Sequence, residues 1–170
     1  SRRLQTMANQ LLELANLRHD QPEWKPQNVS DLFRHVQRTL HNKLAEKAIR
    51  IQWIREIDAI DGDGDLLRSL LVNLIDNAVN ACDAGGHIVV RAAWEDGKKT
   101  VSVQDDGKGM TAEELRHITE PFYRAKASRH RKDGGAGLGL AICRQIAARH
   151  DARLEFSSRP GEGTTAKVIF

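Results

Sequence analysis

Apolar residues recur at every third or fourth position near the start of the chain, which is the spacing of one face of an α-helix. The residues with this spacing are Leu4, Met7, Leu11, Leu14 and Leu17. They predict an amphipathic helix over residues 3–18, whose apolar face needs a partner. Residues 19–28 contain two prolines and many polar side chains, so we expect a linker and a domain boundary there.

The rest of the chain alternates between helical and strand periodicities. Helices are expected at 30–47, 63–84, 111–118 and 138–150. Ser30 is a candidate cap for the first of them. Strands are expected at 49–54, 56–60, 87–94, 99–105, 153–157 and 164–170. Asp96-Gly97 lies between two of these strands and indicates a hairpin. Helices and strands interleaved without repeats predict an α+β fold, a two-layer α/β sandwich.

The composition is that of one soluble globular domain, with 170 residues, 40% of them hydrophobic and 29% charged. No apolar stretch approaches the roughly 18 residues that a membrane span needs, and the N-terminus lacks the apolar core of a signal peptide. Cys82 and Cys143 have no C-x-x-C spacing, so neither a disulfide framework nor a Cys-ligated zinc is indicated. We therefore expect a cytoplasmic protein.

The net charge of +3 is concentrated in one segment, residues 120–135. Its basic residues are Arg124, Lys126, Arg129, Arg131 and Lys132, against Glu120 and Asp133. The segment belongs to a long, glycine-rich connection over about 106–137, and connections of this length are usually functional. One small basic loop favours a small anionic ligand over a nucleic acid, which would more often meet a basic stripe. A solvated loop is the alternative reading.

Three asparagines, Asn73, Asn77 and Asn80, fall within about 60° of one another on the helix expected at 63–84. Asparagine is a mediocre helix former, so this row carries a cost unless the amides have partners. An amide oxygen can ligate Mg²⁺, and the NH₂ group can bond a phosphate or water. A purely structural role is the alternative for each of them.

Asp105 shares a strand face with the apolar Val101 and Val103. A carboxylate on a core-side face is costly to bury without donors, and an exocyclic amine of a ligand would supply one. The glycines that follow, Gly107 and Gly109, permit tight turns and a close approach of backbone to ligand. An ordinary turn at a strand end would have a similar sequence.

A glycine-rich run, Gly134-Gly-Ala-Gly-Leu-Gly-Leu140, leads directly into a helix, whose free N-terminal amides can face phosphate oxygens. The run lacks the Lys-Ser/Thr pair of a P-loop and does not follow a strand as a dinucleotide-binding fingerprint does. A flexible hinge before a helix is the alternative. Gly161-Glu-Gly-Thr-Thr165 reads as a hairpin turn between the last strands.

Together and in this order, these motifs resemble the catalytic ATP-binding domain of sensor histidine kinases, in the superfamily of DNA gyrase, the Hsp90 chaperones and MutL. The matching segments over residues 28–170 are L-L-V-N-L-I-D-N-A, D-D-G-K-G-M, E-P-F-Y-R, G-A-G-L-G-L-A-I and the weaker G-E-G-T-T. The resemblance implies a Bergerat-type fold, with a mixed sheet of about five strands packed against three helices and a preceding helix. It also implies part of the second helix of a dimerisation and phosphoacceptor hairpin at 1–20, a linker at 21–29 and the catalytic domain at 30–170.

The resemblance implies a role for each motif residue. Asp105 receives the adenine amine, Asn77 holds Mg²⁺ and Asn73 assists it, which makes Asn73 and Asn77 the catalytic pair. Asn80 stands where many relatives carry a lysine or arginine. A lid over about 110–135 covers ATP. The remaining implied nucleotide contacts are Gly107, Gly109, Arg129, Arg131, Lys132, Gly135, Gly137, Leu138, Gly139 and Thr164.

The implied activity is transfer of the ATP γ-phosphate to a histidine on a helix absent from this chain, because none of the seven histidines lies in the family's acceptor pattern. Gyrase-type relatives carry a water-activating glutamate at the position of Asn73, so an asparagine there disfavours hydrolysis. The implied partners are ATP, the acceptor hairpin of the full-length protein and a response regulator. We expect a full-length homodimer, with membrane anchoring left open, and a monomeric or weakly dimeric fragment.

Two other functions are weighed against this one. The first is a regulatory module that binds ATP without transferring phosphate, which phosphotransfer by the full-length protein would separate from a kinase. The second is nucleic-acid binding through the cluster from Arg129 to Lys132. It is disfavoured because aromatics amount to only 5% of the chain and none lies within that cluster.

Overall fold

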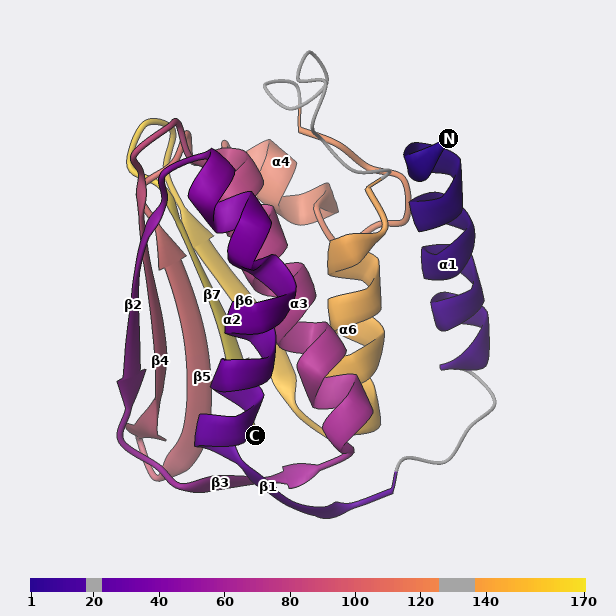
Figure 1. The fold of residues 1–170 in the computed structure, drawn as a ribbon, viewed down its shortest axis with the longest axis vertical. Helices are drawn as coiled ribbons and strands as arrows, with labels where there is room; N and C mark the ends of the chain where they lie inside the picture. The colour runs from indigo at the N-terminus through magenta and orange to yellow at the C-terminus, as the bar shows by residue number, and fades with distance from the viewer. Residues whose placement is uncertain (18–22, 126–136) are drawn as a thin grey trace.

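The computed structural model describes residues 1–17, 23–125 and 137–170. Its main feature is a five-stranded sheet in the order β2-β4-β5-β7-β6 (Figure 1). The strands are β2 (Arg50–Arg55), β4 (His87–Glu95), β5 (Lys98–Asp105), β6 (Arg153–Ser158) and β7 (Thr164–Ile169). β2 pairs with β4 in parallel and the other neighbours are antiparallel, so the expected mixed sheet is confirmed.

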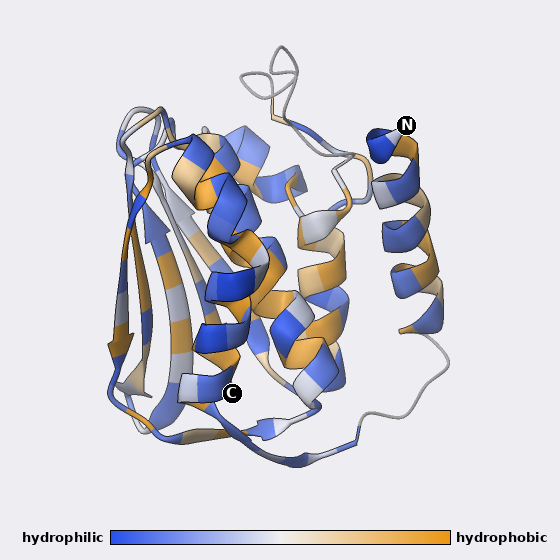
Figure 2. Cartoon of the chain, viewed as in Figure 1, coloured by the Kyte–Doolittle hydropathy of each residue, from blue (hydrophilic) through white to orange (hydrophobic). Residues whose placement is uncertain are grey.

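Helices cover one face of this sheet and form the second layer of the sandwich (Figure 1). They are α2 (Val29–Glu46), α3 (Gly64–Ala81) and α6 (Gly139–Arg149). The burial of side chains alternates along the strands accordingly. Val90 on β4 and Val103 on β5 are buried, whereas their sequence neighbours Arg91 and Ser102 are only half-buried. This alternation is visible as bands along the strands in Figure 2. The hydrophobic core therefore lies between the sheet and these helices.

The predicted hairpin between β4 and β5 is confirmed. Its two loop residues, Asp96 and Gly97, both have positive φ angles, 50° and 77°. This backbone matches the right-handed twist of the strands, and Asn-Gly and Asp-Gly are its preferred sequences. A short helix, α4 (Ala112–His117), follows β5 as expected and is capped by Thr111.

The cap of α2 differs from the sequence prediction. Asn28, not Ser30, is the N-cap: its side chain accepts a hydrogen bond from the backbone N–H of Asp31 at 3.0 Å. Asn28 can take this role because its backbone is still extended at the end of the preceding strand. α3 begins at Gly64 directly after its N-cap Asp63, whose carboxylate accepts from two amides; it ends at Ala81, earlier than the predicted residue 84, because Cys82 already has extended backbone angles.

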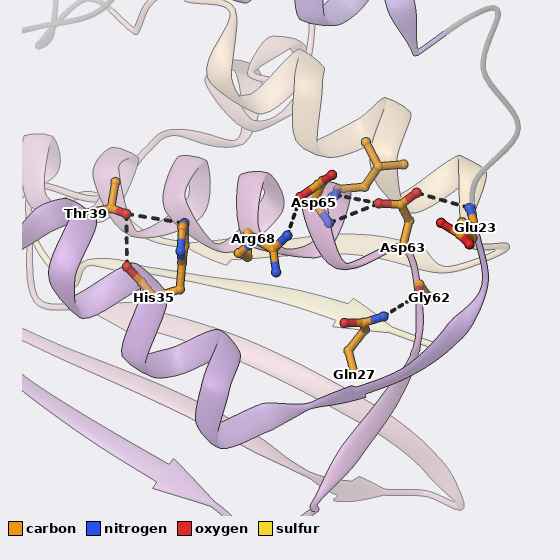
Figure 3. Close-up of polar contacts among 9 residues, drawn as sticks. Glu23, Gln27, His35, Thr39, Gly62, Asp63, Asp65 and Arg68 are labelled. Carbon is orange, nitrogen blue, oxygen red and sulfur yellow. Dashed lines mark hydrogen bonds and ion pairs between the residues drawn. The ribbon is translucent and has the colours of Figure 1, made fainter.

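Part of the expected linker is a strand. β1 (Lys25–Asn28) pairs antiparallel with β3 (Ala59–Gly62), and the two strands form a separate two-stranded sheet. β3 begins at Ala59, later than the predicted start at residue 56. Side chains reinforce this ribbon, because Gln27 donates to the carbonyl of Gly62 at 3.2 Å and Asp63 accepts from the N–H of Glu23 at 3.1 Å (Figure 3). The strand was missed because it is largely exposed and has no apolar alternation.

The N-terminal helix, α1 (Arg2–Asn16), lies beside α6 on the side away from α2 (Figure 1). Leu17 is buried against the core and Leu14 is partly buried, whereas Leu4, Leu11 and Leu12 are exposed. The predicted amphipathic helix is therefore confirmed, and its apolar stripe is covered unevenly: Leu17 is buried and Met7 and Leu14 are half-buried, whereas Leu4 and Leu11 are exposed. None of the helices in the described ranges is both long and apolar enough to cross a lipid bilayer.

Candidate functional site

Asp105 is a buried carboxylate at the end of β5, with 5% of its surface exposed. Its Oδ1 atom accepts hydrogen bonds from the N–H of Gly107 at 2.8 Å and of Thr164 at 3.3 Å. Burial raises the pKa of Asp105 to about 6, although these two amides act in the opposite direction. Oδ2 receives no hydrogen bond from the described residues, so it is available to a donor on a ligand.

The turn after Asp105 interlocks with the turn between β6 and β7. Gly109 has a φ of +68°, and a Cβ atom there would lie 1.8 Å from the carbonyl oxygen of Arg159. Gly163 has a φ of +79°, and its Cβ would lie 2.0 Å from the carbonyl oxygen of Asp105. No side chain fits at either position. This packing explains why the final G-E-G-T-T segment belongs to the same site as Asp105.

Ser158, which sequence reasoning did not single out, joins the two turns. Its hydroxyl accepts from the N–H of Met110 at 2.8 Å, donates to the carbonyl of Gly163 at 2.8 Å and lies 2.9 Å from the Thr164 hydroxyl. Thr164 is thereby held beside Asp105. A lone serine at a strand end carries no sequence signal, so only the fold identifies it.

The Asp105 turn is also tied to the end of α3. Asp106 accepts from the N–H of His87 at 2.9 Å, and the N–H of Lys108 donates to the carbonyl of Ala81 at 3.3 Å. Cys82 lies against Asp106, with its sulfur 3.6 Å from the carboxylate. Burial, followed by the charges of Asp105 and Asp106, raises the pKa of this thiol to about 12, so Cys82 is not a reactive nucleophile.

The asparagine row lies along α3, and Asn73, Asn77 and Asn80 are all half-buried. The Asn73 amide nitrogen donates to the carbonyl of Ser69 at 2.8 Å and to its hydroxyl at 3.2 Å. The side chain of Asn77 makes no hydrogen bond within the described ranges. Its amide therefore remains available to a ligand.

The N-terminus of α6 faces the other end of this row. The N-cap residue Leu138 is fully buried and its side chain gives no capping hydrogen bond. A Cβ on Gly139 would lie 3.1 Å from Asn73 Oδ1. The carbonyl of Gly137 accepts from the N–H of Phe122, which fixes the approach to this helix. The uncapped amides at the start of α6 suit an anion.

The site therefore has two ends joined by α3. Ala81 touches the Asp105 turn and Asn73 adjoins Gly139, and at 1.5 Å per residue these two positions are about 12 Å apart. A buried acceptor at one end and an anion-binding helix terminus at the other suit an elongated ligand with a base and a phosphate group. Arg129, Arg131, Lys132 and Gly135, which the sequence assigns to the phosphate end, lie outside the described residues.

The comparison with known families agrees with this geometry. Residues 62–170 match the family described as histidine kinase-, DNA gyrase B- and HSP90-like ATPase. The chain belongs to this family. The matched region contains the asparagine row, Asp105, the start of α6 and Thr164.

Individual relatives are sensor histidine kinases. The sensor histidine kinase YkoH of Bacillus subtilis (strain 168) is 33% identical over 168 residues, which cover 98% of this chain and 36% of YkoH. A structure of full-length ShkA in complex with AMPPNP has a TM-score of 0.82 at 28% identity, covering 98% of this chain and 35% of that one. The histidine kinase ThkA in complex with response regulator protein TrrA has a TM-score of 0.79 at 22% identity, covering 98% and 47%.

These findings confirm the predicted family and the ATP-binding type of the domain. The chain spans only about a quarter to two fifths of the length of the first curated relatives that it matches. In the described part of the chain, no group of three or more histidine, cysteine, aspartate or glutamate residues is placed to hold a metal ion.

Proposed function

We propose that this chain binds ATP together with Mg²⁺, and that the full-length protein transfers the γ-phosphate to a histidine on its own dimerisation hairpin. The observation that carries the proposal is the buried Asp105 carboxylate, whose Oδ2 receives no hydrogen bond from the described residues. Asp105 lies at one end of the asparagine row, and the N-terminus of α6, which has no side-chain cap, lies at the other. Asp105 selects adenine because it can only accept hydrogen bonds when ionised. Adenine offers an exocyclic amine, whereas guanine presents an oxygen at the equivalent position.

Asn77 is the proposed ligand of Mg²⁺, since its amide makes no hydrogen bond to the described residues and hard cations prefer oxygen ligands. When bound, Mg²⁺ neutralises part of the charge on the phosphate oxygens. Asn73 offers Oδ1 towards the start of α6, beside the amides that would hold the phosphates. A lid over about 110–135 is proposed to bring further cations to the phosphates, namely Arg129, Arg131 and Lys132. The remaining proposed nucleotide contacts are Asn80, Gly107, Gly109, Gly135, Gly137, Leu138, Gly139 and Thr164.

The residue at position 73 favours transfer over hydrolysis. An amide cannot take a proton from water near neutral pH, and both donor contacts of the Asn73 nitrogen go to Ser69. Asn73 can therefore position an oxygen acceptor but cannot activate water as a general base. Phosphoryl transfer needs mainly positioning and charge neutralisation, which this arrangement would supply to an incoming histidine.

The partners follow from the same proposal. The acceptor histidine belongs to a hairpin of the full-length protein, of which α1 is part of the second helix, and the phosphoryl group then passes to a response regulator. Support comes from the relatives, which are sensor histidine kinases, and from the structure of ThkA in complex with the response regulator protein TrrA. Residues 21–29 are the proposed linker, its end fastened to the catalytic domain at 30–170 through β1.

The test is phosphotransfer to a separate acceptor hairpin. The chain is incubated with γ-labelled ATP, with and without the hairpin of its own full-length protein. The proposal predicts an acid-labile phosphohistidine on the hairpin and no label on this chain, because transfer requires the reacting atoms within about 3–3.5 Å. ATP binding without any label on the hairpin would favour the regulatory module instead.

A further inference from the structure

A series of hydrogen bonds connects α1 to Asn73, the first residue of the asparagine row. Glu13 on α1 accepts a hydrogen bond from the hydroxyl of Ser69 on α3. The same carboxylate lies near Cys143 on α6. Burial raises the pKa of the Cys143 thiol most, and the charge of Glu13 raises it further. Glu13 is thus placed between α3 and α6, and it is the acidic residue of α1.

The hydrogen bonds that link Asn73, Ser69 and Glu13 all run in one direction, each residue donating to the next. A carboxylate only accepts, so the Ser69 hydroxyl gives its single hydrogen to Glu13 and offers a lone pair to the next group. That group is the Asn73 amide, which donates to the Ser69 hydroxyl at 3.2 Å and to its carbonyl at 2.8 Å. With the nitrogen directed to Ser69, Asn73 presents Oδ1 on the side of Gly139, where the phosphate end of the site lies.

The contact of α1 with the domain is partial. Leu17 is 5% exposed, but Leu4, Leu11 and Leu12 are 68%, 42% and 61% exposed. Gln10, on the same side of α1 as Glu13, has a buried side-chain oxygen without a hydrogen-bond partner among the residues that the structure describes, which weakens the interface. A helix held by a short apolar contact, one charge-assisted bond and an unsatisfied acceptor is suited to reversible docking.

We propose that Glu13 and Ser69 are positioning residues that couple the docking of α1 to the nucleotide site through Asn73. The inference rests on the proposed nucleotide site but goes beyond it, because it assigns a function to two residues outside the ATP-binding motifs. Coupling of two binding events is reciprocal. Docked α1 should tighten nucleotide binding, and bound nucleotide should tighten the docking of α1.

The experiment uses the whole chain and the ATP analogue AMPPNP with Mg²⁺. Calorimetry measures its affinity for wild type and for Glu13→Ala, Ser69→Ala and Ser69→Thr. We expect roughly fivefold weaker binding in the two alanine variants, at the lower end of typical couplings, and near-normal binding in Ser69→Thr, which keeps the hydroxyl. Asn9→Ala, an exposed position on the same helix, is the matched control and should bind as wild type does.

Hydrogen exchange separates coupling from a merely structural effect. In wild type, AMPPNP should slow the exchange of the backbone amides of α1, and in Ser69→Ala this slowing should disappear. Alanine is the better helix former, so α3 itself should not be weakened by this change. Equal affinities in all variants, or exchange in α1 that does not respond to nucleotide in wild type, would overturn the coupling while leaving the nucleotide site intact. Failure of wild type to bind AMPPNP would overturn both proposals.

Discussion

Replacing Asp105 with asparagine should stabilise the nucleotide-free domain while it weakens ATP binding. The side chain keeps its shape and can still accept from the N–H groups of Gly107 and Thr164, but it no longer carries a buried charge. The carboxylate is 5% exposed, so in wild type its ionisation is opposed by the protein. The variant removes this penalty together with the charged acceptor that the adenine amine would use.

The magnitude follows from the pKa. Burial raises the pKa of Asp105 from 3.8 to about 6, and at about 1.4 kcal/mol per pKa unit this corresponds to roughly 3 kcal/mol. Because the folded-state pKa is raised, the stabilisation that this group provides is complete below about pH 3.8 and is lost as the pH rises through about 6. Asp105→Asn does not titrate. Its advantage in unfolding free energy over wild type should therefore grow by about 2.4 kcal/mol between pH 4 and pH 7.5.

The assay is denaturant unfolding of both proteins at several pH values, combined with ATP titration. At about pH 7.5 the variant should bind ATP about 1.5–3 kcal/mol more weakly, the range for a hydrogen bond to a charged group. Below about pH 6 the affinity of wild type should fall more steeply than that of the variant, because only wild type has a carboxylate at position 105 that takes up a proton. A stability difference that is the same at both ends of the pH range would refute the burial argument.

Three further changes test separate parts of the account. Asn77→Ala should remove the Mg²⁺-dependent part of nucleotide affinity and leave metal-free binding closer to normal, which titrations with and without Mg²⁺ measure; an equal loss in both would make Asn77 structural. Gly163→Ala places a Cβ 2.0 Å from a carbonyl oxygen and should abolish nucleotide binding and lower the melting temperature, whereas Gly161→Ala, with the same φ of +79° and open space around it, should cost only about 1 kcal/mol. Asn28→Ala should cost about 1 kcal/mol in chemical unfolding as the loss of a cap, and Ser30→Ala clearly less; the reverse order would contradict the observed cap.

Patterns local in the sequence were predicted well. The apolar stripe of α3 and the Asp96-Gly97 turn each depend on residues a few positions apart, so periodicity and turn chemistry suffice to identify them. The alternation along β5 placed Asp105 on the buried face, and the structure confirms its burial. The motif order was specific enough to indicate the family before the fold was known.

Features that depend on distant pairing were not predicted. β1 is defined by its partner β3, more than 30 residues away in the chain, and its own residues have no apolar pattern. The cap of α2 moved to Asn28 for the same reason, because that pairing extends the backbone before the helix. Ser69 gains its contact with Glu13 only from the packing of α1, and a lone serine on a helix carries no signal of it.

The central claim is that Asp105 and its turn recognise the adenine of ATP. The most direct measurement follows the backbone amide signals of Gly107 and Thr164, the two donors to Asp105, by NMR during titration with ATP and, separately, with GTP, each with Mg²⁺. The account predicts saturable shifts of both signals with ATP and little response to GTP. Equal responses to the two nucleotides, or ATP binding that leaves both signals unmoved, would contradict it.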